Sequence, residues 1–372
     1  MTSSIYWLHV GDLHMDEADD WAALPRLRQI VQEANAHAAD AAFVYLPGDN
    51  ANHAIAAQYA AIVQALSPLT LPWRAIPGDH DFEGGSLATY EASFAPAQRP
   101  ECEVFGGHRC IFLDVVSAGQ GGPDFRLSAH HLHRATRELA RAQAEGQTPL
   151  VFMHTFPGDM ADGGEQLARL FADARVAFVD TGHTHYNELL NDGWVVYGAT
   201  RSTAQIEEDD GRPGFSLVCV HDSVPSVRFR RIGQPWPHVQ IVSPCDVRLL
   251  TRVTDPRQVP RPGTLQVVAR RIGHATAPME VSLDAGAPSP MQDAGAGLWQ
   301  ASLEGVGAGL HRVVVACGEA RDSVEVLVRP VDDLPRRHQL VAPGHACHTI
   351  GAWAPAGMDG TQRGPNRNGG GW

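Results

Sequence analysis

Short apolar runs alternate with helix-like segments over the first two-thirds of the chain. The segments 22–39 and 128–144 carry apolar residues at helical spacing, and Ser128 is suited to cap the second of them. The apolar runs lie at 5–10, 41–46, 73–76, 110–116, 150–153, 176–179 and 194–197. Runs of this kind without apolar–polar alternation are typical of strands covered on both faces, so the pattern predicts an α/β layered domain.

The pattern changes near Trp236, which Pro235 and Pro237 flank. The next hundred residues or so alternate apolar and polar positions with period two, and Gly- and Pro-containing turn signals separate the alternating stretches. Such spacing without helices predicts an Ig-like β-sandwich. The end of the chain is rich in Gly and Pro and predicts an extended tail, which we expect to pack back on the first domain. The predicted domains are 1–235, 236–332 and 333–372.

Composition and charge narrow the classes of function. The chain has 372 residues, of which 44% are hydrophobic and 19% charged, so global disorder is excluded. Its net charge is −13, and residues 1–235 hold 30 acidic against 16 basic residues. This acidic excess argues against a nucleic-acid surface. Every basic residue is Arg, because the sequence has no Lys, which excludes lysine Schiff-base chemistry and a Walker lysine.

Two further absences in the sequence suggest a compartment. The six cysteines are scattered without CxxC spacing, as in proteins of a reducing compartment. No signal-peptide pattern opens the chain, and no apolar run approaches the ~18 residues of a membrane span. We therefore expect a cytoplasmic protein without a membrane partner.

Five polar clusters follow predicted strands, and they carry the candidate chemistry. They are 11–14 (Gly-Asp-Leu-His), 48–50 (Gly-Asp-Asn), 78–81 (Gly-Asp-His-Asp), His154 and 182–185 (Gly-His-Thr-His). The carboxyl ends of strands share one edge of an open α/β sheet, so these clusters are predicted to converge on one crevice. They supply imidazole and carboxylate but no thiolate, a set that suits Mn, Fe or Zn.

The ordered series D-x-H, G-D, G-D-H-D, H and G-H-x-H resembles the calcineurin-like metallophosphoesterase superfamily over roughly residues 5–200. The resemblance implies a four-layer α/β/β/α sandwich with two metal ions and hydrolysis of phosphate esters. One ion would be held by Asp12, His14 and His185, and the other by Asp79, His154 and His183. Asp49 would bridge the two ions.

The same resemblance assigns catalytic roles. Two cations ~3.5–4 Å apart neutralise the phosphate and supply a bridging hydroxide near neutral pH. His80 would be the general acid, oriented by Asp81. The chain departs from the family pattern at Asp79, where the family normally has Asn; the added charge should tighten the second metal and weaken its Lewis acidity.

Other residues are weaker candidates. Arg201 could bind a substrate phosphate through two N–H groups of its guanidinium, and Asn52 and His53 could contact the substrate. The histidines of the 128–144 helix (His130, His131 and His133) are better explained as a solvated face. His345, Cys347 and His348 lack a fourth partner for a metal site, and the tryptophans are expected to pack rather than to stack on sugars.

These observations favour a dinuclear-metal phosphohydrolase acting on a small phosphate ester. The histidine and spacing of the 78–81 cluster resemble the bacterial cyclic-nucleotide and glycerophosphodiester branch, so a phosphodiesterase is the leading interpretation. Alternatives are a phosphomonoesterase or nucleotide pyrophosphatase on the same site, and a non-catalytic scaffold protein. A complete ligand set argues against the scaffold. A homo-oligomer is compatible with the sequence, which leaves the substrate and the metal identities open.

Overall fold

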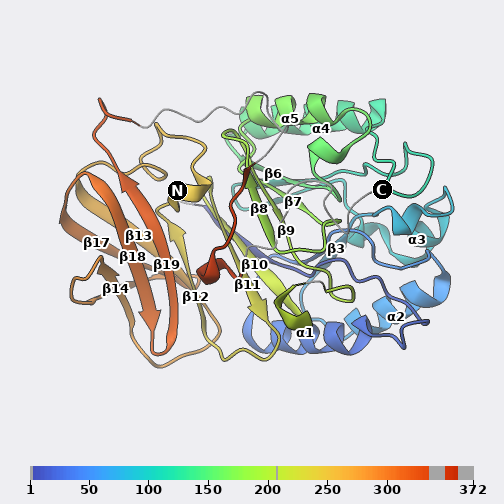
Figure 1. Ribbon diagram of the computed structural model, residues 1–372, viewed down its shortest axis with the longest axis horizontal. Coiled ribbons are helices and arrows are strands. Elements are labelled where there is room, and N and C mark those ends of the chain that lie inside the picture. The colour runs from blue at the N-terminus through green and yellow to red at the C-terminus, as the bar shows by residue number, and fades with distance from the viewer. Residues whose placement is uncertain (1–2, 207, 335–347, 359–372) are drawn as a thin grey trace.

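A computed structural model describes residues 3–206, 208–334 and 348–358 (Figure 1). It contains an α/β sandwich built from the N-terminal part of the chain and a smaller all-β sandwich beside it. The predicted fold class is therefore confirmed. His345 and Cys347 lie outside the described residues.

The first sheet of the α/β sandwich has the strand order β11-β10-β1-β2-β3. Strands β1, β2 and β3 are parallel, while β10 runs antiparallel to β1. The strands are β1 (Ser4–His9), β2 (Val44–Leu46), β3 (Trp73–Ala75), β10 (Gly214–His221) and β11 (Val224–Arg231).

The second sheet has the order β20-β8-β9-β7-β6-β5-β4, with β5, β6, β7 and β9 parallel to one another. Its strands are β4 (Cys102–Phe105), β5 (His108–Phe112), β6 (Thr148–Phe152), β7 (Phe178–Thr181), β8 (Glu188–Asn191), β9 (Val196–Ala199) and β20 (His348–Thr349).

Helices cover the outer face of each sheet, as Figure 1 shows. Helices α1 (Ala23–His37), α2 (Ala56–Leu66) and α3 (Ala88–Ser93) pack on the first sheet, and α4 (Ala129–Ala144) and α5 (Gly164–Asp173) pack on the second. The Ser128 hydroxyl accepts a hydrogen bond from the backbone N–H of His131, so Ser128 caps α4 as expected. His131 also donates from Nδ1 to the Asp114 carbonyl, and His130 and His133 are exposed.

The two sheets pack face to face through an aromatic core. On the side of the first sheet, Trp7 of β1 packs against Phe43, which directly precedes β2. These rings contact Phe152 and Phe178 of the second sheet. All four side chains are buried. Because these strands are buried on both faces, they appear in the sequence as continuous apolar runs. The face-to-face packing of the sheets also brings the carboxyl ends of β1, β2, β6 and β7 next to one another.

The all-β sandwich consists of two four-stranded sheets, β12-β13-β17-β16 and β15-β14-β18-β19. Alternate residues, including Leu265, Val267, Val313 and Val326, form its core. Its strands are β12 (His238–Ser243), β13 (Gly263–Ile272), β14 (Met279–Leu283), β15 (Ser289–Pro290), β16 (Gln292–Gly295), β17 (Leu298–Val306), β18 (Gly309–Cys317) and β19 (Ala320–Val328). Short 3-10 turns lie at η1 (His80–Phe82), η2 (Pro96–Gln98), η3 (Pro157–Asp159), η4 (Asp209–Gly211), η5 (Val247–Leu249) and η6 (Ala354–Ala356).

A buried ion pair joins the two sandwiches. The Arg228 guanidinium on β11 donates to both oxygens of Asp322 on β19, at 2.8 and 3.1 Å. Asp322 also accepts from the backbone N–H of Ile241 at 2.7 Å. This carboxylate therefore ties the end of the first sheet to both sheets of the second domain.

The described part of the tail returns to the α/β sandwich. β20 pairs antiparallel with β8, and Trp353 is buried between the guanidinium groups of Arg228 and Arg248. These stacked contacts are cation–π interactions. In the described residues, no helix combines the length and apolarity needed to cross a bilayer. The five cysteines within these residues are free thiols.

Candidate metal centre

The polar clusters meet at the carboxyl ends of the strands of both sheets. Asp12 and His14 follow β1, Asp49 follows β2 and Asp79 follows β3. His154 follows β6, while His183 and His185 follow β7. All seven side chains are buried, and the structure gathers them into two groups that could each hold a metal ion.

The first group consists of Asp12, His14, Asp49 and His185, whose ligand atoms lie within 4.8 Å of one another. The Nε2 atoms of His14 and His185 are 2.8 Å apart. His14 Nε2 is 3.6 Å from Asp49 Oδ2, and His185 Nε2 is 3.7 Å from Asp12 Oδ2. Two imidazole nitrogens and two carboxylate oxygens therefore face one point.

The second group consists of Asp49, Asp79, His154 and His183. His154 Nε2 lies 3.1 Å from Asp79 Oδ1 and 3.4 Å from Asp49 Oδ1, and His183 Nδ1 lies 3.4 Å from Asp79 Oδ1. Asp49 belongs to both groups and presents a different oxygen to each. It could therefore offer one oxygen to each of two ions.

Backbone and side-chain acceptors orient two of the imidazoles. His154 donates from Nδ1 to the Pro47 carbonyl at 2.7 Å, and His14 donates from Nδ1 to Asn52 Oδ1 at 3.1 Å. Because Nδ1 carries the proton in each ring, Nε2 keeps its lone pair for a metal. The sequence had suggested Asn52 as a substrate contact, whereas the structure shows it holding a candidate ligand.

The ligand loops adopt strained backbone conformations. His14, Asp49, His183 and His185 have positive φ angles of 39°, 49°, 67° and 61°. Non-glycine residues rarely occupy this region, and such strain concentrates at functional sites. Gly48, with φ of 111°, has no room for a side chain, because a Cβ there would lie 2.3 Å from His154 Nδ1.

The electrostatics of the buried groups favour bound cations. Burial raises the pKa of Asp12 to about 6 and lowers the pKa of His14 to about 4. Burial would lower the pKa of His154, but Asp49 and Asp79 raise it well above its ordinary value. Burial would likewise raise the pKa of Asp49, but His154 holds it well below. Without metal, the carboxylates thus recruit a proton on His154 as their counter-charge.

The donor set fits a pair of divalent ions. Three buried carboxylates and four imidazoles provide oxygen and nitrogen ligands without sulfur, the preference of Mn, Fe and Zn. Asp12 Oδ1 is buried and has no hydrogen-bond donor among the described residues. A buried carboxylate oxygen without a donor is costly, and a cation would remove that cost.

His80 stands beside both groups. Its backbone N–H donates to Asp49 Oδ1 at 3.0 Å, and its ring lies 4.6 Å from that of His14. The ring donates from Nδ1 to the Asn52 carbonyl at 2.8 Å, which leaves Nε2 as the atom that can face a substrate. Burial would lower the pKa of His80, but Asp49 and the Asn52 carbonyl raise it.

The buried carboxylate of Asp81 holds backbone groups of two loops. Its carboxylate accepts from the backbone N–H groups of Gly78, Asn50 and Ala51, and from the hydroxyl of Tyr59. Within the described residues, the Asn52 carbonyl rather than Asp81 accepts the hydrogen bond from the His80 ring. Asp81 instead fastens the loop after β2 to the loop after β3.

Arg201, the expected substrate contact, is buried and paired with two carboxylates. Its side chain is 1% exposed, and its guanidinium pairs with Glu208 at 2.9 Å and with Asp209 at 3.0 Å. It also covers the ring of Phe229 at 4.2 Å. These two carboxylates neutralise the charge that was expected to meet a phosphate. His53 is half-exposed and pairs with Glu83 at 3.1 Å, outside the two ligand groups.

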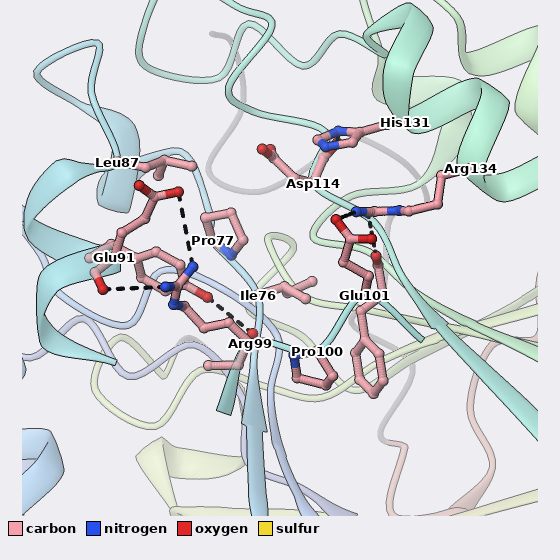
Figure 2. A pocket seen from close by; sticks show the side chains of 13 residues that line it. Ile76, Pro77, Leu87, Glu91, Arg99, Pro100, Glu101, Asp114, His131 and Arg134 are labelled. Carbon is pink, nitrogen blue, oxygen red and sulfur yellow. Dashed lines mark hydrogen bonds and ion pairs between the residues drawn. The ribbon is translucent and has the colours of Figure 1, made fainter. Parts of the chain in front are cut away.

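A separate cavity of about 160 Å³ is lined in part by Pro77, Arg99 and Arg134 (Figure 2). Arg134 pairs with Glu101 at 2.7 Å, and Arg99 lies 3.9 Å from the Glu91 carboxylate. None of the seven candidate ligands lines this cavity. Its arginines therefore belong to local ion pairs, not to the metal centre.

The α/β sandwich and its two ligand groups with one shared carboxylate have the arrangement that the sequence resemblance implied. A family profile described as calcineurin-like phosphoesterase matches residues 7–187. This part of the chain is therefore a calcineurin-like phosphoesterase domain, as the sequence motifs predicted.

Several solved structures resemble 62% of this chain. A dimetal phosphatase from Danio rerio is 12% identical, with a TM-score of 0.49 and 97% of its own length covered. TT1561 of Thermus thermophilus is 16% identical, with a TM-score of 0.44 and 100% of its length covered. GAP50, described as the anchor in the inner membrane complex of Plasmodium, is 12% identical, with a TM-score of 0.45 and 85% covered. No curated protein matches the chain.

Proposed function

We propose that this protein is a dinuclear-metal phosphodiesterase that hydrolyses a small phosphate diester. The observation that carries the proposal is the position of Asp49, which is shared by two buried ligand groups and accepts a hydrogen bond from the backbone of His80. Each of the seven positions carries a side chain that can coordinate a metal, including Asp79, where the family normally has Asn. This completeness supports an enzyme over a non-catalytic scaffold.

Asp12, His14 and His185 would hold one ion, Asp79, His154 and His183 the other, and Asp49 would join them. When bound, such a pair of ions supplies charge neutralisation of the phosphate and a nucleophile near neutral pH. The donor set suits Mn, Fe and Zn alike.

The protein residues provide positioning and a proton. The Asn52 carbonyl fixes the ring of His80, so its Nε2–H can donate to the leaving oxygen of the ester. Burial would lower the pKa of His80, but the nearby carboxylates of Asp49 and Asp79 raise it. They therefore favour the protonated form of this imidazole. Pro47 and Asn52 hold His154 and His14 in fixed tautomers.

The ion pairs of Arg201 support a preference for diesters. A phosphate monoester carries close to two negative charges at neutral pH, and enzymes commonly meet such charge with arginine forks. A diester carries only one. Because Glu208 and Asp209 already neutralise Arg201, this arginine is not available for the extra charge of a monoester. A monoesterase or nucleotide pyrophosphatase on the same residues is the alternative.

The remaining expectations are part of the same proposal. A cytoplasmic location, a small-molecule substrate, the absence of nucleic-acid and membrane partners and a homo-oligomeric state stay predictions. The acidic first domain supports a small substrate over nucleic acid.

The decisive experiment is an activity panel with bis(p-nitrophenyl) phosphate, p-nitrophenyl phosphate and cyclic nucleotides, each with Mn, Fe or Zn. We expect the highest kcat/KM on a diester. A clear preference for monoesters would overturn the diesterase assignment, and no activity with any metal would overturn the hydrolase. Asp49→Ala, which removes the shared carboxylate, should abolish both activity and binding of the ion pair.

A further inference from the structure

Four polar side chains are buried between the two sheets, on the strands that lead to the metal ligands. They are Trp7, His9, Tyr45 and Asp180, which we call the inter-sheet cluster. His9 is the last residue of β1 and lies three residues before Asp12. Asp180 lies on β7, three residues before His183. The cluster therefore lies one layer below the ligands, at the same end of the strands.

Asp180 links the two sheets through hydrogen bonds. Trp7 Nε1–H donates to Asp180 Oδ2 at 2.6 Å, and His9 Nδ1 lies 2.6 Å from Asp180 Oδ1. Both donors come from β1 of the first sheet, and the acceptor comes from β7 of the second. The three side chains are buried, so these short contacts are shielded from water and lock their geometry.

Stability alone does not account for this arrangement. A buried carboxylate costs free energy that an apolar side chain at position 180 would avoid, and the surrounding core is aromatic. His9 Nε2 and the Tyr45 hydroxyl are also buried without a hydrogen-bond partner among the described residues. The cluster is thus a costly polar insertion in an apolar interface, placed on the strands that deliver ligands.

The spacing between β1 and β7 sets the geometry of the metal centre. β1 delivers Asp12 and His14, whereas β7 delivers His183 and His185, and the two strands belong to different sheets. Their sheets share no strand pairing, so this spacing depends on contacts between side chains and loops. One such contact is the hydrogen bond from the His183 N–H to Asp12 Oδ2 at 2.7 Å.

We propose that Asp180 is a positioning residue, which sets the distance between the β1 ligands and the β7 ligands and thereby the affinity for metal. This inference rests on the proposed function only in that the ligand groups bind metal. Asp180 touches neither substrate nor ligand; it acts through Trp7 and His9. Its loss should therefore weaken metal binding without removing a ligand.

The test compares two buried carboxylates of the second sheet. Asp180→Asn replaces one accepting oxygen by an amide N–H₂ and removes the negative charge, so Trp7 and His9 lose the charged acceptor that they share. Asp192→Asn is the matched control, because Asp192 is also buried and accepts from the backbone N–H groups of Trp194 and Val195, each at 2.7 Å, in the turn between β8 and β9. β9 runs parallel to β7, so this turn lies at the sheet edge opposite the ligands.

Metal-free proteins would be titrated with Mn²⁺ by calorimetry, and their thermal unfolding would be followed without metal. We expect both variants to lose stability, but only Asp180→Asn to bind Mn²⁺ about tenfold more weakly, the size of effect seen when supporting residues of metal sites are changed. If Asp180→Asn does not fold, Trp7→Phe removes one of the same two hydrogen bonds and should weaken binding in the same direction.

The outcomes separate this inference from the proposed function. Wild-type protein that binds no Mn²⁺ would overturn both. Wild-type binding with an unchanged affinity in Asp180→Asn, or in Trp7→Phe where that variant is used, would overturn the positioning role alone. Equal weakening in the Asp180 and Asp192 variants would also overturn it, because the effect would then follow general stability.

Discussion

The sharpest test of the metal centre is a single methyl group added at Gly78. A Cβ at this position would lie 2.2 Å from Asp49 Oδ1 and 2.7 Å from Cε1 of His154. The Cβ would also lie 2.3 Å from the backbone N of Asp49, and ordinary van der Waals contact begins at 3.4 Å, so the backbone at Asp49 must shift by about 1.2 Å together with the shared carboxylate. Gly78→Ala therefore displaces the one residue common to both ligand groups without changing any ligand.

A displacement of about 1 Å in a catalytic constellation costs roughly 100-fold in rate, or about 2.7 kcal/mol. We expect kcat/KM on bis(p-nitrophenyl) phosphate to fall by that factor in Gly78→Ala, and Mn²⁺ affinity measured by calorimetry to fall with it. Gly84→Ala is the matched control, because no atom lies within 4 Å of a Cβ there and φ is not positive. Wild-type kinetics and Mn²⁺ affinity in Gly78→Ala would refute the close approach of the two loops.

Three further predictions concern the proton donor, the pH dependence and the domain junction. His80→Asn should lower kcat on diesters by about 10²–10⁴-fold, while the Mn²⁺ affinity measured by calorimetry stays unchanged. If the variant lost Mn²⁺ affinity as well as kcat, His80 would be a metal ligand and not a proton donor. His154 has a raised pKa without metal, so Mn²⁺ must displace a proton, and affinity should fall as pH falls; a Kd that is equal at pH 6 and pH 8 would contradict this. Asp322→Ala leaves Arg228 buried without its carboxylate, which should cost about 3–5 kcal/mol in the free energy of unfolding; a melting temperature within 2–3 °C of wild type, roughly 1 kcal/mol, would exclude it.

Short-range patterns carried most of the information that the sequence holds about the site. Asp12 and His14, or His183 and His185, are separated by one residue after a recognisable strand, so their convergence follows from the parallel sheets alone. The four layers follow from strands that are apolar on both faces. The fold class and the convergence of these side chains could therefore be predicted without coordinates.

Long-range pairings could not be predicted in this way. The role of Arg201 depends on Glu208 and Asp209 in a loop, and the orientation of His80 depends on a backbone carbonyl, for which residue type gives no signal. Asp180 and His9 are 171 positions apart and meet only because two sheets pack face to face. Such partners become visible only when tertiary structure is known.

The return of the tail to the α/β sandwich has a consequence for self-association. β20 occupies the hydrogen-bonding edge of β8, so a strand from a second molecule cannot pair with residues 190 and 191 of β8 while β20 is in place, and on that side it would meet the two-residue β20 instead. The opposite margin of the same sheet is β4, where Val104 is 44% exposed. A dimer built by strand addition would therefore find a longer edge at β4, which has four residues, than at β20, which has two.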